Sequence, residues 1–314
     1  MLALDKELFQ GRDFLSLHDF SQDEIMYLLK VAAQLKTLQK AGTPHHLLSG
    51  KSLGMIFTKS STRTRVSFEV GMYQLGGQAL FLSSRDIQLG RGETIADTAR
   101  VLSRMLDGIM IRTFSHQEVE QLAEYATIPV INGLTDLLHP TQVLADLLTI
   151  QEHKGRLEGL KLAYIGDGNN MAHSLMFGGA KMGLHVIIAS PDGYKPNPEI
   201  VALAQADAKA NGGLVEVVTD PLSAVKDADV LYTDVWASMG QENEAEIRKA
   251  AFAGYQINGE TLKAAAPGAI VLHCLPAHRG EEITDEVLES EQSVVFDEAE
   301  NRLHAQKAIM ALVL

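Results

Sequence analysis

The sequence predicts an α/β protein with two doubly wound domains, each a central parallel β-sheet flanked by helices. Short apolar runs of strand character alternate with helix-length segments along the chain. The alternation pauses at one helical stretch, residues 141–153, and then restarts. The length of 314 residues suits two domains of about 100–200 residues each. We expect residues 1–142 and 143–299 to form them.

The first series of elements has strand-like runs at residues 52–57, 78–82, 108–111 and 129–132. Apolar residues recur at helical spacing between Val66 and Leu75, and Gly76-Gly77 ends that helix. Two more helices are expected over residues 95–106 and 119–125. The second series has strands at residues 161–165, 185–189, 215–218, 229–233 and 269–272. Ligands in such sheets bind beyond the carboxyl ends of the strands, so we expect the active site in the interdomain cleft.

The composition is that of an ordinary soluble globular protein, with 46% hydrophobic and 21% charged residues. The net charge of −13 argues against a nucleic-acid partner, which requires a basic face. No apolar run is long enough for a transmembrane helix, and the N-terminus lacks the pattern of a signal peptide. A lone cysteine, Cys274, permits no intrachain disulfide and fits a reducing compartment. We therefore expect a cytoplasmic protein without a membrane partner.

The first polar motif, residues 58–65, follows a strand and opens a helix. Its hydroxyl groups and the first N–H groups of that helix could converge on one anion. Arg63 adds a fork of donors matched to phosphate oxygens. The alternative is a polar helix cap with solvated arginines. Arg112 and His139 also follow strands, and each alone would suit a structural role.

The second series carries its own polar motifs. Residues 166–171 contain an incomplete G-x-G-x-x-G pattern, which disfavours a nucleotide cofactor, while their amides suit a small zwitterionic ligand. Asp234 follows a strand and could hold an ammonium group; Trp236 is expected to fill the core. Cys274 ends another strand, where a buried structural thiol is the alternative. The sequence contains no recognisable metal pattern, P-loop or hydrolase elbow, so we expect no metal.

Seven blocks, in order along the chain, resemble the ornithine branch of the aspartate/ornithine carbamoyltransferase family, and the resemblance as a whole runs from about residue 10 to the C-terminus. They are Ser61-Thr62-Arg63-Thr64-Arg65, Arg112, His139-Pro140-Thr141-Gln142, Asp167-Gly168-Asn169-Asn170, Asp234 with Ser238-Met239-Gly240, His273-Cys274-Leu275-Pro276 and Glu298-Ala299-Glu300-Asn301-Arg302. The resemblance implies transfer of the carbamoyl group from carbamoyl phosphate to the δ-amine of L-ornithine, giving citrulline in arginine metabolism. Gln88 stands in a loop where the aspartate enzymes carry a lysine.

The resemblance also implies a role for each site residue. Ser61, Thr62, Arg63, Thr64, Gln88 and Arg112 would bind the phosphate. The carbamoyl group would be surrounded by His139, Gln142, Cys274, Leu275 and Arg302. Ornithine would be bound by Asn170, Asp234, Ser238 and Met239. The residues expected to take part in catalysis are Arg112, His139, Cys274 and Arg302.

Assembly and mechanism follow from the same resemblance. Family members form homotrimers or multiples of trimers, in which the loop with Gln88 reaches a neighbouring site. The final helix, about residues 300–314, would cross back onto the first, carbamoyl-phosphate-binding domain, and residues 143–299 would bind ornithine. The neutral amine would attack the carbamoyl carbon and phosphate would leave, with Arg302, His139 and Thr64 as donors to the oxyanion. Cys274 near Asp234 would help remove a proton from the amine. No cofactor is needed.

Three alternatives remain at this point. The acceptor could be putrescine or an acylated ornithine, although Asp234 and Ser238-Met239-Gly240 argue against putrescine, which lacks an α-carboxylate. The chain could be a non-catalytic binding subunit, which the presence of Arg63, His139 and Arg302 disfavours. An NAD-dependent oxidoreductase is disfavoured by the broken glycine pattern.

Overall fold

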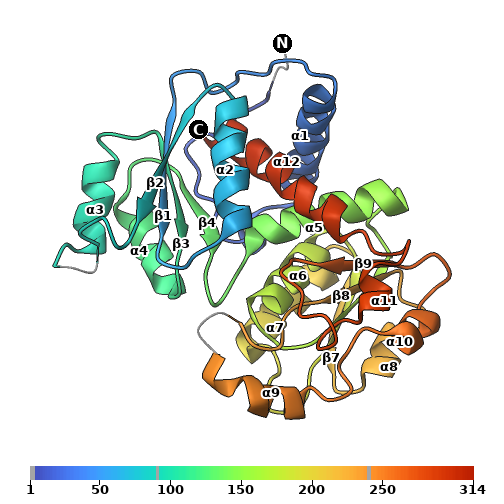
Figure 1. Ribbon diagram of the computed structural model, residues 1–314. Coiled ribbons are helices and arrows are strands. Elements are labelled where there is room, and N and C mark those ends of the chain that lie inside the picture. Colours follow the sequence, from blue (N-terminus) through green and yellow to red (C-terminus); the bar gives the residue numbers. More distant parts are fainter. Residues whose placement is uncertain (1–3, 90–91, 239–241) are drawn as a thin grey trace. The chain divides into compact units, whose positions relative to one another are not determined.

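A computed structural model describes residues 4–89, 92–238 and 242–314. The chain divides into two compact units, one of residues 1–148 and 300–314, the other of residues 149–299 (Figure 1). Each unit contains one parallel β-sheet with helices against it, so the predicted fold class is confirmed. No helix in the described ranges combines the length and apolarity that crossing a membrane requires.

In unit 1 the described strands pair in the order β2-β1-β3-β4, all parallel. The strands are β1 (Ser52–Phe57), β2 (Gln78–Ser83), β3 (Gly108–Arg112) and β4 (Val130–Leu134). The helices are α1 (Gln22–Lys40), α2 (Thr62–Gln74), α3 (Ile95–Leu102) and α4 (His116–Tyr125), preceded by a 3-10 turn, Leu17–Asp19. On one sheet face Ile56, Ile109 and Ile111 pack with residues of α3 and α4.

In unit 2 the described strands pair in the order β7-β6-β5-β8-β9, again all parallel. They are β5 (Lys161–Ile165), β6 (His185–Ala189), β7 (Leu214–Val218), β8 (Val230–Thr233) and β9 (Ile270–His273). The helices are α6 (Asn170–Lys181), α7 (Pro198–Ala210), α8 (Pro221–Val225), α9 (Ala245–Ala251), α10 (Gly259–Ala264) and α11 (Asp285–Leu288), with a 3-10 turn at Glu242–Glu244. Two further helices, α5 (Pro140–Lys154) and α12 (Val295–Val313), begin in one unit and end in the other.

Two helices differ from their expected bounds. Helix α3 ends at Leu102, before the predicted residue 106. The carbonyl of Ala99 accepts from the hydroxyl of Ser103 as well as from its N–H, and such an added side-chain bond bends and weakens a helix at that point. Helix α12 begins at Val295, ahead of the expected residue 300. Its first turns include a buried Glu298 whose carboxylate accepts from Tyr232 and from the N–H of His273, so a tertiary contact determines this start. Trp236 lies in the core of unit 2, as predicted.

Helix α2 has two apolar faces with different surroundings. Phe68, Met72 and Leu75 are fully buried. Val66, Val70 and Tyr73 lie on another face and are exposed, Tyr73 by 78%. The neighbouring edge strand β2 also exposes Leu80 and Phe81. Exposed apolar side chains on a helix and a neighbouring edge strand are typical of a protein–protein contact surface.

Candidate functional site

Polar residues gather where the strand order of each sheet reverses. In unit 1 the reversal lies between β1 and β3, and the motif at residues 58–65 and Arg112 stand at the carboxyl ends of these strands. In unit 2 it lies between β5 and β8, followed by Asp167 and Asp234 respectively. Ligands of open parallel sheets bind at such reversals. Each unit therefore offers a candidate binding site.

The site of unit 1 begins at the first turn of α2. Ser61 caps the helix, since its Oγ accepts from the N–H of Thr64 at 3.2 Å. The Nη2 of Arg302 donates to the Oγ1 of Thr64 at 2.7 Å, which brings together residues far apart in the chain. The Nε of Arg63 is buried and finds no acceptor among the described residues. A helix start with an unfilled guanidinium donor is suited to an anion.

His139 is surrounded by cations. Burial lowers its pKa well below the ordinary value, and the charges of Arg302, Arg112 and Lys59 lower it further. The imidazole therefore stays neutral and can donate a hydrogen bond without carrying charge. The arrangement concentrates positive charge on one place in a chain whose net charge is −13.

Lys59 is a residue of the candidate site that the sequence reasoning missed. Its side chain is only 6% exposed, and its Nζ lies 3.1 Å from a carboxylate oxygen of Asp136. The same ammonium lies over the ring of Phe114, at 4.9 Å from the centroid. Its charge acts on His139. Its position within the hydroxyl-rich motif could have indicated a role in the site, but a lysine at that position is equally compatible with an exposed side chain.

The other predicted residues of unit 1 have mixed surroundings. Arg112 and Gln142 are buried, and the amide of Gln142 donates to Asp146 at 2.8 Å. Thr62 and Gln88 are exposed, Gln88 in the segment between β2 and α3. Part of that loop, residues 90 and 91, lies outside the described residues.

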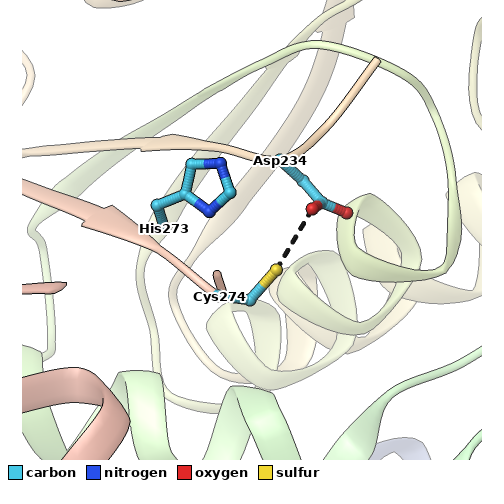
Figure 2. Close-up of side chains that lie close together, drawn as sticks. All are labelled: Asp234, His273 and Cys274. Atoms are coloured by element: carbon cyan, nitrogen blue, oxygen red, sulfur yellow. Dashed lines mark hydrogen bonds between the residues drawn. The ribbon is translucent and has the colours of Figure 1, made fainter. Parts of the chain in front are cut away.

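The site of unit 2 centres on Asp234 at the end of β8 (Figure 2). Its Oδ1 accepts from the thiol of Cys274 at 3.1 Å and from the N–H of Val235 at 2.8 Å. Its Oδ2 accepts from the Nδ2 of Asn169 at 2.9 Å. The structure thus brings together the two side chains, Cys274 and Asp234, that were expected to act on the amine. The donors fix the direction of the carboxylate.

Asn169 is the second residue missed by sequence reasoning, which selected its neighbour Asn170. The Oδ1 of Asn169 caps α6 by accepting from the N–H groups of Met171 and Ala172. It also accepts from the hydroxyl of Tyr164, whose pKa burial raises well above the ordinary value. The nearby carboxylates of Asp234 and Asp167 raise that pKa further, so the phenol remains a donor. The amide is thereby oriented with its NH₂ towards Asp234.

His273 lies beside Cys274 and Asp234, and the ligand atoms of the three approach within 4.8 Å of one another (Figure 2). Both ring nitrogens of His273, however, already form hydrogen bonds. Its Nδ1 accepts from the N–H of Leu275 at 2.9 Å, so the proton is assigned to Nε2, which donates to the buried Glu282 at 3.0 Å. A metal ion would have to displace one of these bonds. We assign His273 to orienting the segment that carries Cys274.

The remaining predicted residues of unit 2 are Asn170, Ser238, Met239 and Leu275. Asn170 is buried at the first position of α6, and Ser238 is half-buried. Leu275 adopts a positive φ of 56°, a strained conformation for a branched residue that tends to persist at functional sites. Met239 and Gly240 lie outside the described residues.

A buried ion pair supports this site. Arg248 in α9 donates through Nη1 to Asp167 at 2.8 Å and to the carbonyl of Trp236 at 3.0 Å. Its guanidinium also lies over the ring of Tyr194, at 5.0 Å. Burial raises the pKa of Asp167 and the charge of Arg248 opposes that shift. Arg248 therefore ties the segment after β5 to the segment after β8.

Replacing Arg248 with methionine should lower the free energy of unfolding by about 3 kcal/mol, because Asp167 would stay buried without its cation. Urea denaturation followed by circular dichroism measures the change. Arg279→Met is the matched control, since Arg279 pairs with Asp285 and Glu289 in an exposed position and its loss should leave the urea midpoint unchanged. Equal shifts for both variants would contradict the role given to Arg248.

The chemistry of the two sites defines a class of enzyme. One parallel α/β unit offers cations and helix N–H groups to an anion, and the other offers an oriented carboxylate to an ammonium or amine. A protein of this class transfers a group from an anionic donor to an amine acceptor, and it lacks the complete G-x-G-x-x-G motif of dinucleotide-binding proteins.

Comparison with known proteins identifies the particular family. Residues 12–152 match the model for the carbamoyl-P binding domain of aspartate/ornithine carbamoyltransferase, and residues 158–313 match its Asp/Orn binding domain. An ornithine carbamoyltransferase of Symbiobacterium thermophilum is 67% identical over 97% of this chain and 98% of that protein. The solved ornithine carbamoyltransferase of Pyrococcus furiosus is similar at 58% identity and a TM-score of 0.94, covering 97% of both chains. The chain belongs to the aspartate/ornithine carbamoyltransferase family.

Proposed function

We propose that this protein transfers the carbamoyl group of carbamoyl phosphate to the δ-amine of L-ornithine, giving L-citrulline and phosphate in arginine metabolism. The observation that carries the proposal is Asp234, which is held by Asn169 and Cys274 at the end of β8. An oriented carboxylate suits the α-ammonium of an amino acid. The relatives named ornithine carbamoyltransferase, such as that of Thermococcus kodakarensis at 60% identity, support the same acceptor.

The residues of unit 1 would hold the donor. Arg63, Arg112 and the first turn of α2 bind the phosphate and stabilise the negative charge that it gains on leaving. Arg302 and Thr64, already joined at 2.7 Å, and the neutral His139 donate to the carbamoyl oxygen, on which charge develops in the transition state. Lys59 adds a further positive charge to those of Arg302 and Arg112 near His139.

The residues of unit 2 would hold the acceptor. Asp234 pairs with the α-ammonium of ornithine and Asn170 reaches its carboxylate end. Ser238 binds the amino-acid end as well, and the same role is proposed for Met239, which lies outside the described residues. Cys274 is hydrogen-bonded to Asp234 through its thiol. As a thiolate, its own proton having passed to solvent, it would accept the proton of the δ-ammonium, whose free pKa is ~10.4 like that of lysine. Leu275 is proposed, with Cys274, to be among the residues that surround the carbamoyl group. Holding both reactants together accounts for much of the rate enhancement, and these steps involve no cofactor.

A colorimetric citrulline assay tests the proposed acceptor. Ornithine, putrescine and N-acetylornithine are offered side by side with carbamoyl phosphate at equal concentrations. We expect product with ornithine alone, because both analogues lack a group that Asp234 or its neighbours would bind: putrescine has no α-amino acid end and acetylornithine has no α-ammonium. Comparable rates with all three amines would show that the acceptor assignment is wrong.

We further propose a cytoplasmic homotrimer, or a multiple of trimers, in which the loop with Gln88 completes a neighbouring subunit's site. The exposed apolar side chains Val66, Val70 and Tyr73 of α2, beside the edge strand β2, support a contact between copies of the chain. The exposure of Gln88 supports a role outside its own core. A single cysteine is consistent with a reducing compartment.

Mixing two inactive variants tests the shared site. One variant carries Gln88→Ala with the tip of its loop deleted, and the other carries Arg112→Ala. Neither homotrimer should form citrulline, but refolding the two together should restore a fraction of the activity. Some sites in mixed trimers would receive an intact loop from one chain and an intact Arg112 from the other. Mixed trimers, verified by light scattering, that remain inactive would show that Gln88 does not act across subunits.

A further inference from the structure

Helix α12 carries a second buried cation that the proposed chemistry does not use. Lys307 is fully buried, and burial alone lowers the pKa of its ammonium to about 8. Placing an ammonium out of water costs free energy that only well-formed hydrogen bonds offset. The burial of the Lys307 ammonium, in the same helix as Arg302, therefore needs a structural explanation.

The hydrogen bonds of Lys307 join α12 to two other parts of unit 1. Its Nζ donates to the Oε1 of Gln74, the last residue of α2, at 2.8 Å. It also lies 3.2 Å from the Nε2 of His45, in the segment before β1. The Nδ1 of His45 lies 2.9 Å from the carbonyl of Thr43, which can only accept, so the ring proton is assigned to Nδ1. The lone pair of Nε2 is then free to accept from the ammonium.

Side chains of helix α12 lie against the backbone of α2 at Gly71. Figure 1 shows where the two helices α2 and α12 lie in the fold. A Cβ at Gly71 would stand 3.0 Å from the Cε of Met310 and 3.1 Å from the Cγ of Lys307. The absence of a side chain at Gly71 therefore allows the stem of Lys307 to pass along α2 and reach Gln74. At the other end of α2, Arg302 of the same helix donates to Thr64. Two hydrogen bonds thus connect α12 to the first and last turns of α2.

We propose that Lys307 is a positioning residue for carbamoyl transfer, which fixes α12 on α2 through Gln74 and His45 and so holds Arg302 at Thr64. The inference rests on the proposed function, in which Arg302 and Thr64 contact the carbamoyl group. A displacement of about 1 Å at a reacting group can cost roughly a hundredfold in rate. Lys307 acts at a distance from the substrate, through the placement of a helix.

The test is Lys307→Met, which keeps the length of the buried stem and removes the ammonium. We expect kcat for citrulline formation to fall about tenfold, while KM for ornithine changes less than about twofold, at a temperature where circular dichroism shows the variant to be folded. A merely structural residue would lower Tm and leave kcat unchanged, and that result would overturn the proposal. Wild-type protein is assayed first: if it forms no citrulline, the proposed function fails, independently of Lys307.

A control and a second background sharpen the result. Lys40→Met is the matched control, because Lys40 contacts α12 at Glu300 from an exposed position, and its activity should equal that of the wild type. In an Arg302→Ala background, adding Lys307→Met should reduce kcat by less than about twofold, since Lys307 acts through Arg302. A tenfold loss in both backgrounds would overturn the proposal. If Lys307→Met does not fold, Gln74→Leu removes the acceptor instead and should show the same pattern to a smaller degree.

Discussion

The Arg63→Ala enzyme should lose roughly a hundredfold or more in kcat/KM for carbamoyl phosphate. Arg63 stands in the first turn of α2, with a buried Nε that no described residue accepts from. A charge-assisted pair with phosphate, in a site of low dielectric constant, contributes on the order of 3 kcal/mol. Each ~1.4 kcal/mol corresponds to a factor of ten in rate. Steady-state citrulline formation at varied carbamoyl phosphate measures the loss.

The matched control for this variant is Arg100→Ala. Arg100 belongs to the same unit, pairs with Asp97 on an exposed part of α3 and lies over the ring of Tyr125. Its removal takes away one positive charge without touching the site, so activity should stay near that of the wild type. Near-normal activity in Arg63→Ala would remove Arg63 from the phosphate site. An equal loss in both variants would point to overall charge instead of a local contact.

Asp234→Asn should raise KM for ornithine by roughly a hundredfold and leave the affinity for carbamoyl phosphate nearly unchanged. The carboxylate is held in place by Asn169, Cys274 and the N–H of Val235. Neutralising it removes the partner of the α-ammonium, a loss on the order of 3 kcal/mol for a buried charge pair. Calorimetry with carbamoyl phosphate, and kinetics with ornithine, separate the two ligands.

Asp192→Asn serves as the control for Asp234. Asp192 lies in the same unit, and its side chain is 87% exposed beside Lys195. Its neutralisation should change neither ligand's affinity. Weakening of both ligands to the same degree in Asp234→Asn would mean that the substitution disturbs the fold of unit 2, and the local-contact assignment would then be wrong.

The strands and the local part of the anion site were readable from the sequence. The strands β1, β5 and β6 have the bounds that the apolar runs predicted, because a parallel strand buried on both faces is a continuous apolar run. The cap of α2 was also readable, since Ser61 bonds to the backbone three residues further on. The apolar runs depend only on the exclusion of solvent, and the cap depends only on residues that are close in sequence.

Helix α2 shows what such sequence patterns cannot predict. Its two apolar faces have the same helical spacing, yet Phe68, Met72 and Leu75 are buried while Val66, Val70 and Tyr73 are exposed. Periodicity reports that a face is apolar and does not report what covers it. The predicted limits of α3 and α12 were wrong for a related reason. The hydroxyl of Ser103 forms a hydrogen bond at the end of α3, and the buried Glu298 forms one with a distant residue near the start of α12.

The sequence by itself determined the fold class, most strands and the residue types available for an anionic donor and an amine acceptor. Only the tertiary structure decided which of these residues meet. Thr64 and Arg302 bond across a separation of 238 residues, and Asn169 and Asp234 across 65. The sequence analysis singled out neither Lys59 nor Lys307, yet both are buried. The physical reason is that a hydrogen bond between distant segments depends on how whole helices and sheets pack, which no local pattern of residues encodes.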